Sequence, residues 1–542
     1  SAMKIDVDGN KLIATHNGPT SGNAAETFNL DTMSQLGDGG QGPIHGDNSL
    51  SSSETYYGYG TIITGNTHMP FKTNNFGNTI RPVVNGDDIY FGYNYLHRIR
   101  EHKDPMLAMT NQIRSGFNTG WMPANCKRCM LASTDSTNLS GADLLTNGYF
   151  DSNANNWTAD NGFSVSQSSG RLVVNSNGNS GSYFGAVQSF NTVVGKTYVL
   201  AVDIYSQNHN AVVRLSGSSI YFTVTGLGTG HHTFQFTSDQ VSHNLQVGSN
   251  VGGGGNREQQ FNEIHVREAD PDRAIQAQGF ITRGTVPKSP VAPGAELMAY
   301  GPFASNTDML VQGYSGDLNY GTGDFYYMIW VNISSHSPLQ GIWSRQDNDQ
   351  SSGNRIQFQT VPNGDGQLNF YGGHGNGNIS GMKVQLNTWE HLAMVRRDNL
   401  MYWYLNGENV SSYGDATNYT NDKAVLRVGG LSLTSTSAFS AGAYAMSAGK
   451  IALFKTGAEA PTPEQMREIY QDEKKLFAPN TKCDFGSTNN YVRALEFDKD
   501  TDTLHVGTDV GRSDFNGLVR INTTSTPVTT VISASNGLIA EQ

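Results

Sequence analysis

The chain alternates apolar and polar residues over many short stretches, and this pattern predicts β-strands. Residues 171–174, 198–204 and 232–236 alternate in this way, and residues 325–331 form a short apolar run. Alternation is typical of a strand with one buried face, and a short apolar run between turn residues is typical of a strand buried on both faces. The pattern therefore predicts a mostly β protein.

A strand–turn–strand unit recurs near both ends of the chain. Residues 5–15 contain a strand, a turn rich in Asp, Gly and Asn, and a second strand. Residues 83–92 and 495–508 repeat this order, and a further strand follows each unit. Short β units that recur are typical of a propeller-like array. A chance recurrence of common hairpin patterns is the alternative.

Two differently patterned blocks lie between these units. Residues 143–268 alternate as the strands of an antiparallel β-sandwich do. Residues 272–478 contain further strands and a hairpin turn at Asn406-Gly407. We therefore predict a propeller-like repeat scaffold that is split by two β-sandwich, or jelly-roll, inserts. The scaffold parts are residues 1–140 and 481–542, and the inserts are residues 141–270 and 271–480.

One helix is expected at the end of the second insert. Thr462 is a favourable N-cap, Pro463 suits the first turn and Gln465 completes a capping box. Apolar side chains follow at helical spacing. A second, short helix is expected after Pro105.

The composition agrees with this fold class. Gly accounts for 62 of the 542 residues, charged residues for 15% and aromatic residues for 10%. Average chains contain about 25% charged residues, and disordered chains are usually charge-rich and poor in aromatics. A mainly helical chain would contain more Glu, Lys, Ala and Leu. The composition thus argues against disordered and mainly helical proteins.

The net charge of −12 argues against nucleic acid and against an anionic membrane as the partner. No apolar run approaches the ~20 residues of a membrane-spanning helix, so membrane insertion is not expected. The 3 cysteines are too few for a disulfide scaffold.

The opening of the first insert resembles a family of carbohydrate-binding modules that begin LLxNGxFxxxxxxWT. Residues 144–150 read LLTNGYF, and Trp157-Thr158 complete the pattern. Residues 261–266, FNEIHV, are similar to the final strand of that family. The resemblance implies a β-sandwich that binds carbohydrate.

The second insert resembles the laminin-G-like, concanavalin-type jelly rolls. Residues 324–331 (DFYYMIWV), 389–393 (WEHLA) and 404–407 (YLNG) stand where that family has its strand motifs. Residues 449–454 (GKIALF) and the helix after them also fit. The resemblance implies a second lectin-like module.

The order of the modules is similar to that in tail proteins of marine bacteriophages, which insert lectin-like modules into a repeat scaffold. Residues 121–123 (WMP), before the first insert, and residues 504–508 (LHVGT), after the second, support the comparison. The resemblance implies a virion tail or fibre protein, or an extracellular one. Its expected partners are host cell-surface polysaccharide and other virion proteins, and a homo-oligomer is a further expectation.

Candidate glycan-binding residues combine flat aromatic faces with polar side chains, because a sugar ring presents both C–H groups and hydroxyls. The candidates in the first insert are Tyr183, Phe184 and Tyr221. The candidates in the second insert, near polar loops, are Trp343, Arg345, Tyr371, His374 and Tyr413. Four other tryptophans are expected in the cores, namely Trp157, Trp330, Trp389 and Trp403.

Calcium is the metal that the resemblance implies, with oxygen atoms as its ligands. Family topology places Asn147 and Asp151, in the opening of the first insert, near Asn262 in its last strand. Residues 498–502 imitate the start of a calcium loop, but Thr503 stands where that loop has Gly. A solvated hairpin turn is the better interpretation there.

Cys126 and Cys129 form a CxxC pair. A redox motif would begin a helix after a strand, and a zinc site would need a second pair, for which only Cys483 is left. We expect two unrelated cysteines in a junction loop.

The chain shows no recognisable catalytic motif. Jelly-roll glucanases place their carboxylates on one strand as ExDxxE or ExDxE, and the second insert has no such run. No G-x-S-x-G, phosphate-loop or H-E-x-x-H pattern is present. We therefore expect a non-enzymatic protein. A polysaccharide depolymerase, acting as glycosidase or lyase, and a secreted bacterial adhesin are the alternatives.

Overall fold

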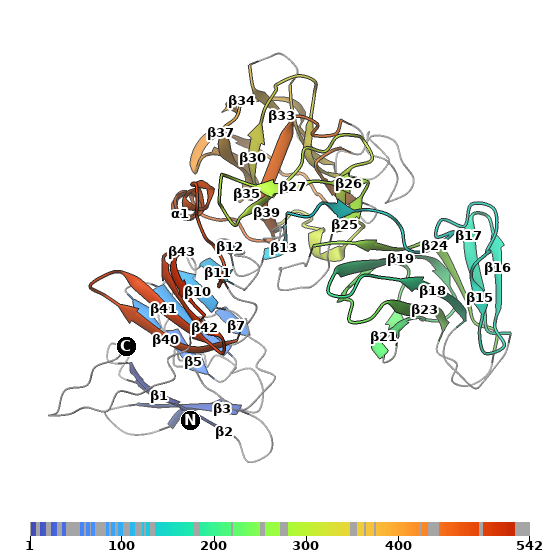
Figure 1. The fold of residues 1–542 in the computed structure, drawn as a ribbon, viewed down its shortest axis with the longest axis horizontal. Helices are drawn as coiled ribbons and strands as arrows, with labels where there is room; N and C mark the ends of the chain where they lie inside the picture. The colour runs from blue at the N-terminus through green and yellow to red at the C-terminus, as the bar shows by residue number, and fades with distance from the viewer. Residues whose placement is uncertain are drawn as a thin grey trace. The chain divides into compact units, whose positions relative to one another are not determined.

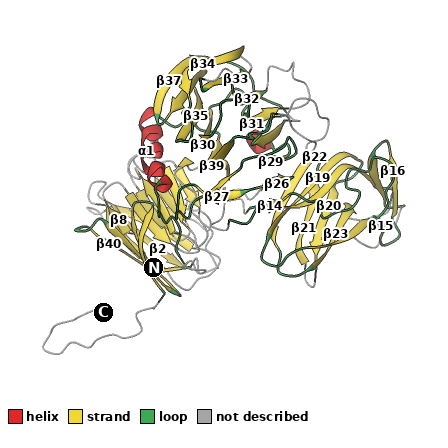
Figure 2. Ribbon diagram, turned by 45° about the horizontal axis from the view of Figure 1, so that its top comes forward, coloured by secondary structure: helices red, strands yellow, loops and turns green. Residues whose placement is uncertain are grey.

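The structure is a computed structural model that forms two compact units. One contains residues 1–125, 291–297 and 461–542, and the other contains residues 126–290 and 298–460. The structure describes the strands named below that precede residue 136, and residues 136–177, 185–217, 220–249, 255–270, 280–346, 355–361, 365–372, 375–421, 424–431, 444–486 and 491–525. Strands predominate in these residues, as predicted (Figures 1 and 2).

The first unit consists of antiparallel sheets in which strands that follow each other in sequence are neighbours. One sheet has the order β1 (Ala2–Asp6), β2 (Lys11–Asn17), β3 (Asn23–Asn29), β4 (Gln35–Gly39), and another β5 (Thr55–Gly58), β6 (Thr61–Thr64), β7 (Thr67–Pro70). A third contains β8 (Val83–Asn85), β9 (Asp88–Gly92), β10 (Leu96–Arg100), β11 (Met109–Ile113), β12 (Met122–Pro123). The fourth contains β40 (Val492–Asp498), β41 (Thr503–Thr508), β42 (Gly511–Asn516), β43 (Val519–Thr524). The predicted strand–turn–strand units are thus confirmed.

The third and fourth of these sheets share one hydrophobic core, although they come from opposite ends of the chain. The rings of Tyr90 and Phe497 stack with their centroids 6.1 Å apart. A Cβ atom at Gly92 would lie 2.5 Å from Cβ of Val492, so only glycine permits this approach. The two ends of the chain therefore contribute to a single unit.

Helix α1 (Pro463–Lys474) belongs to the same unit and confirms the predicted capping box. The Thr462 side chain accepts a hydrogen bond from the Gln465 backbone, and the Gln465 side chain accepts one from the Thr462 backbone. Met466 and Ile469 are fully buried. A short 3-10 turn, η2 (Lys475–Phe477), follows. The helix expected after Pro105 lies outside the described residues. No described helix is long and apolar enough to cross a membrane.

The second unit begins with a β-sandwich of two five-stranded sheets, as predicted. One has the order β15 (Thr158–Ala159), β18 (Ala186–Asn191), β23 (Ser242–Ser249), β20 (Ala211–Ser216), β21 (Ile220–Leu227). The other, here the front sheet, has the order β16 (Ser164–Ser168), β17 (Arg171–Asn175), β24 (Glu258–Glu268), β19 (Thr197–Gln207), β22 (Gly230–Thr237). Trp157 lies in the core between them, as expected.

The rest of the second unit is a jelly roll. Its larger sheet contains β27 (Lys288–Pro290), β28 (Met298–Tyr300), β39 (Gly449–Gly457), β30 (Phe325–Ile333), β35 (Trp389–Arg397), β36 (Leu400–Leu405), β37 (Glu408–Gly414), with β13 (Cys126–Met130) paired to β39. The seven-stranded sheet contains β25 (Ile281–Arg283), β29 (Met309–Gln312), β38 (Val425–Val428), β31 (Gly341–Gln346), β32 (Ile356–Thr360), β33 (Gln367–Gly372), β34 (Gly375–Lys383). A short pair, β14 (Leu139–Ser140) and β26 (Thr285–Val286), and a 3-10 turn, η1 (Gly316–Leu318), complete this unit.

Some local predictions for the jelly roll are confirmed and others are corrected. The turn between β36 and β37 has φ values of 53° at Asn406 and 83° at Gly407, as an Asn-Gly hairpin requires. Trp330 and Trp403 are buried in the core as expected, whereas Trp389 is half-buried. The expected junction loop around Cys126 is instead strand β13 of the larger sheet, because its backbone pairs with β39.

Candidate functional site

Two β-bulges lie opposite each other in the front sheet of the β-sandwich. The pairing of β19 with β24 shifts register on both sides of Ile204, so that Tyr205 and Asn262 have no partner across the ladder. Phe261 and Ile264 are both core residues, so the two residues between them share the outer face. Bulges redirect side chains and are frequent beside binding sites. Here they direct Asn262 and Tyr205 outward.

These two side chains form a polar and aromatic network with Arg171 of β17. Cζ of Arg171 lies 3.5 Å from the centroid of the Tyr205 ring. Nε of Arg171 donates a hydrogen bond to Oδ1 of Asn262 at 3.0 Å, and Nδ2 of Asn262 donates to Oδ2 of Asp203 at 2.9 Å. Tyr205 is nevertheless 50% exposed. The network thus fixes the position of Tyr205, whose aromatic ring remains accessible to solvent.

A tight turn fixes the position of Arg171. The two residues between β16 and β17, Ser169 and Gly170, have φ values of 53° and 74°, as in a type I′ hairpin. Arg171 is the first residue after this turn and pairs with Ser168. The local sequence therefore sets the register in which Arg171 meets Asn262.

The surroundings of this network are polar and open. Ser164, Ser166 and Ser168 of the edge strand β16 are exposed, and each pairs with a residue of β17 on the same face. At the start of β24, Glu258 accepts hydrogen bonds from Gln260 at 2.9 Å and from Asn175 at 3.5 Å. We define the open face by its network residues Arg171, Tyr205, Asn262 and Asp203, with these serines at its edge. Such a surface matches both the C–H groups and the hydroxyls of a sugar.

Another part of the front sheet's outer surface packs against the jelly roll. Val199 and Ala201 of β19 belong to one buried apolar cluster with Met309, Val311 and Val425. Apolar contact therefore occupies one part of β19, and the open face lies farther along the same strand.

His265 of β24 is a fully buried histidine. His265 is in close contact with Asp143 through Nδ1, and its Nε2 lies 3.2 Å from Oε2 of Glu263. Burial lowers the pKa of His265, but the hydrogen bonds to these two carboxylates outweigh that effect and raise it above its usual value. Burial likewise raises the pKa of Asp143, and the hydrogen bond with His265 reverses this and lowers it.

The seven-stranded sheet of the jelly roll also has a polar outer row. Paired residues of antiparallel strands share a face. Ser344 pairs with Gln357, which pairs with Tyr371, and Gln359 pairs with Asn369. Gln346, on the same face of β31, is 1% exposed, and neither of its amide atoms has a hydrogen-bond partner within the described residues. This polar row is a second candidate surface, but Ser344, Gln346, Gln357 and Gln359 are buried and only Asn369 and Tyr371 are half-buried.

The predicted glycan ligands of the jelly roll lie in different environments. Tyr371 is part of the polar row, half-buried, with Cζ of Arg355 5.3 Å from its ring centroid. Trp343 is 1% exposed and stacks on Tyr327 in the core, so its ring faces are occupied by protein. Arg345 is equally buried and donates hydrogen bonds to backbone carbonyls. Tyr413 is half-buried and packs against the core.

The structure does not describe the side chains of four other residues that are predicted to bind glycan. Tyr183, Phe184 and His374 lie outside the described residues. Tyr221 belongs to β21, at the edge of the sheet behind the open face, and the structure describes only its backbone.

The three predicted calcium ligands do not contact one another. The Asn147 side chain donates hydrogen bonds to the carbonyls of Asn153 and Asn155. Asp151 is exposed, and Asn262 belongs to the open face. Within the described residues, no group of three or more His, Cys, Asp or Glu side chains could hold a metal ion.

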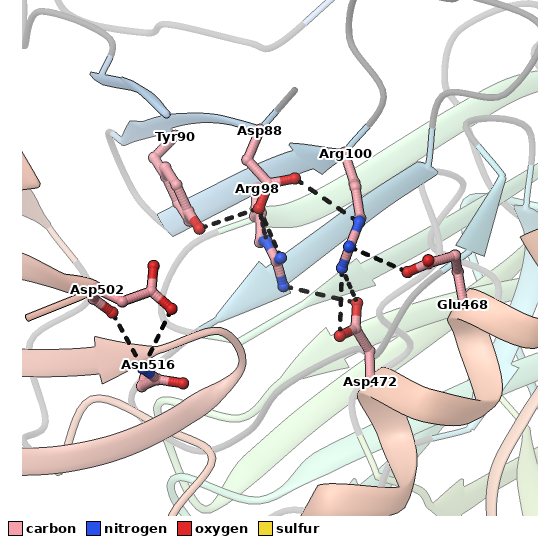
Figure 3. Close-up of polar contacts among 8 residues, drawn as sticks. All are labelled: Asp88, Tyr90, Arg98, Arg100, Glu468, Asp472, Asp502 and Asn516. Carbon is pink, nitrogen blue, oxygen red and sulfur yellow. Dashed lines mark hydrogen bonds and ion pairs between the residues drawn. The ribbon is translucent and has the colours of Figure 1, made fainter. Parts of the chain in front are cut away.

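A charged cluster in the first unit connects its sheet to helix α1 (Figure 3). Arg98 donates hydrogen bonds to Asp88 at 2.9 and 2.6 Å, and its Nη1 lies 3.7 Å from Asp472 of the helix. Arg100 reaches both Asp472 and Glu468 at 3.1 Å. Three carboxylates surround the two arginines, so the cluster joins two elements and has no surplus positive charge for an anionic ligand.

Comparisons with known proteins identify the jelly roll. Residues 308–446 match the family model of a laminin G type, described as the concanavalin A-like lectin/glucanases superfamily. This stretch is therefore a laminin-G-like jelly roll, as the sequence motifs implied. A search of curated proteins gives no match.

Solved structures give distant matches. Domain 4 of an extracellular arabinanase from Geobacillus stearothermophilus, in complex with arabinotriose, is 17% identical over 35% of this chain and 82% of that chain, with a TM-score of 0.26. A putative carbohydrate binding protein from Bacteroides ovatus is 12% identical over 64% of this chain and 94% of that chain, with a TM-score of 0.24. Scores this low carry no argument about function.

Proposed function

We propose that this protein binds glycans, without modifying them, through the open face of its β-sandwich. The observation that carries the proposal is the network of Arg171, Tyr205 and Asn262, in which a half-exposed aromatic ring lies beside amide and guanidinium donors. An aromatic ring packs against the C–H face of a sugar, and the polar side chains around it orient the hydroxyls. The lectin-like family match of the neighbouring jelly roll supports the same ligand class.

We propose binding rather than catalysis because the carboxylates in and beside this face are engaged by neighbouring amides. Asp203 accepts a hydrogen bond from Asn262, and Glu258 accepts two from amide side chains. A glycosidase needs one carboxyl group to donate a proton and a second to attack or to activate water. Incubation with bacterial polysaccharides, followed by reducing-end and unsaturation assays, tests this part of the proposal. Release of shortened chains would identify a depolymerase instead.

We further propose that the protein serves in a virion tail or fibre and attaches the particle to host cell-surface polysaccharide. The order of the modules supports this role: two lectin-like inserts interrupt a scaffold of meander sheets, which we propose to be propeller-like. Homo-oligomers and other virion proteins would present several copies, and linked weak sites bind far more tightly than single ones. We include Ca²⁺ in the proposal as a support for glycan binding, so a chelator should weaken that binding. Competition of the purified protein with particle adsorption tests the attachment role.

The binding proposal is tested with the full chain on a glycan array, followed by titration calorimetry with the best ligand. We expect Tyr205→Ala to weaken binding by about 2- to 10-fold, because an aromatic contact of this kind contributes roughly 0.5–1.5 kcal/mol. Tyr491→Ala is the matched control. Tyr491 is also an exposed tyrosine, 46% accessible, with Arg493 5.5 Å from its ring centroid, but it belongs to the scaffold. Equal effects of the two substitutions would contradict the proposed site.

A further inference from the structure

Arg171 forms no ion pair within the described residues, unlike the buried arginines of the scaffold. Its contacts are the hydrogen bond to Asn262 and the ring of Tyr205, both neutral groups. By contrast, Arg98 lies 2.6 Å from Asp88, and Arg520 lies 2.7 Å from Glu296. The positive charge of Arg171 is therefore held in place without direct contact with a carboxylate, because Asp203 bonds to Asn262.

The two contacts of Arg171 also leave its remaining donors available. Stacking on Tyr205 uses the flat face of the guanidinium, and the bond to Asn262 uses only Nε. Nη1 and Nη2 have no hydrogen-bond partner within the part of the chain that the structure describes. Their N–H groups lie in the plane of the guanidinium and form the fork that binds a carboxylate or a sulfate with two parallel hydrogen bonds.

The direction of this fork is fixed before any ligand arrives. Asn262 is held by its own hydrogen bond to Asp203, and the bulge in β24 keeps it on the outer face. Because both ends of the Arg171 contact are anchored, little side-chain entropy is lost on binding. The site thus has the two properties of an anion receptor, a positive charge without a direct ion pair and a prepared geometry.

From this geometry we propose that the glycan bound at the open face is acidic, with a uronate carboxylate or a sulfate ester held by the Nη groups of Arg171. The inference rests on the proposed glycan-binding function and specifies the class of its ligand. The exposed part of the Tyr205 ring and the serines of β16 contact the neutral part of the same sugar chain.

The test compares ligands that differ only in their acidic groups. Oligogalacturonate is titrated into the full chain beside its carboxyl-reduced counterpart of equal length, and a sulfated galactan oligomer beside its desulfated form. We expect at least one acidic ligand to bind about 10- to 100-fold more tightly than its neutral counterpart, as charge-assisted hydrogen bonds imply. The two pairs distinguish a carboxylate from a sulfate as the recognised group. Added salt should reduce the preference.

Substitution of Arg171 assigns the preference to this side chain. Arg171→Gln should abolish the preference for the acidic ligand, and Arg171→Lys, which keeps the charge without the fork, should reduce it. The matched control is Arg493→Gln, because Arg493 also lies over a tyrosine but is paired with Asp509 at 2.6 Å. The control should keep the preference of the unmodified protein. Thermal melting checks that each variant is folded. If Arg171→Gln does not fold, the affinities of Arg171→Lys for the acidic and neutral ligands provide the test.

The outcomes separate this inference from the function on which it rests. Equal affinity for acidic and neutral ligands would overturn the inference and leave glycan binding intact. An acidic preference that persists in both Arg171 variants would overturn it as well, because another cation would be responsible. Absence of binding to any glycan would overturn both proposals.

Discussion

The guanidinium of Arg171 lies 3.5 Å from the ring centroid of Tyr205, although β24 separates their strands in the sheet. The contact crosses β24 at Asn262, the residue that its bulge directs outward. Two register shifts and one tight turn thus bring together three side chains that lie far apart in the sequence.

This contact predicts an energetic coupling between Arg171 and Tyr205. We expect a double-mutant cycle with Arg171→Met and Tyr205→Leu to give a coupling of about 0.5–1 kcal/mol in the free energy of unfolding, typical of an exposed cation–π pair. The same cycle at Arg493 and Tyr491, where the separation is 5.5 Å, should give a smaller value. Urea denaturation provides both numbers, and additive effects at Arg171 and Tyr205 would disprove the coupling.

Replacement of Gln346 by methionine should stabilise the jelly roll. Gln346 is 1% exposed and its amide atoms have no partner in the described residues, so burial costs about 1–3 kcal/mol that methionine avoids. Gln340→Met is the control, because Gln340 is equally buried but bonds to the backbones of Ser335 and Ala448, at 2.7 Å each. We expect denaturation midpoints to rise for Gln346→Met and to fall for Gln340→Met. A fall for both would mean that Gln346 has an important polar role.

The first unit should lose stability as the pH rises from about 4 to about 8. Burial of Asp484 and its hydrogen bond to Glu296 raise its pKa from 3.8 to about 8, against the opposing effect of Arg520. The folded state therefore binds this proton more tightly than the unfolded state. The stability that Asp484 contributes is fully present below its pKa in the unfolded state. This stability is lost as the pH rises toward its pKa in the folded state.

Asp484→Asn tests this assignment, because the amide mimics the protonated carboxyl at every pH. Unfolding by urea at pH 5, 6, 7 and 8 should give a flatter pH dependence for the variant than for the unmodified protein. The same slope in both proteins would show that another group binds the proton.

The two arginines that contact helix α1 should contribute unequally to stability. The side chain of Arg98 is 6% exposed and that of Arg100 is 27% exposed, and both lie near Asp472. Arg98→Met leaves the half-buried Asp88 without its main partner and removes one of the two arginines near Asp472, so the upper limit of the cost is about 3–5 kcal/mol. Arg100→Met should cost about 1 kcal/mol or less, because solvent screens this pair. Chemical denaturation of the two variants checks the order, and a reversed order would contradict it.

Elements with local signals were predicted well from the sequence. The capping residues Thr462 and Gln465 define the start of α1, and Asn406-Gly407 defines a hairpin, because the relevant interactions join residues a few positions apart. The buried strand at 325–331 also needs only its own composition, and it lies within β30.

The candidate site was harder to predict because exposure depends on distant strands. Trp343 lies near polar loops in the sequence, but its ring packs on Tyr327 of another sheet. Arg171 and Tyr205 carry no motif, and the break in alternation after Ile204 is the one local sign of their role. The sequence predicts Asn262 as a calcium ligand, whereas in the structure its hydrogen-bond partners are Arg171 and Asp203.

The sequence by itself determined the mostly β character, the hairpin units, the capped helix and the lectin-like motifs, since periodicity and turn chemistry depend on neighbouring residues. Only the tertiary structure decided which aromatic side chains are exposed and which polar ones are buried. A shift of one residue in strand register moves a side chain to the opposite face of a sheet, and the partner strand sets that register. In this protein the bulges of β19 and β24 place Tyr205 and Asn262 beside Arg171.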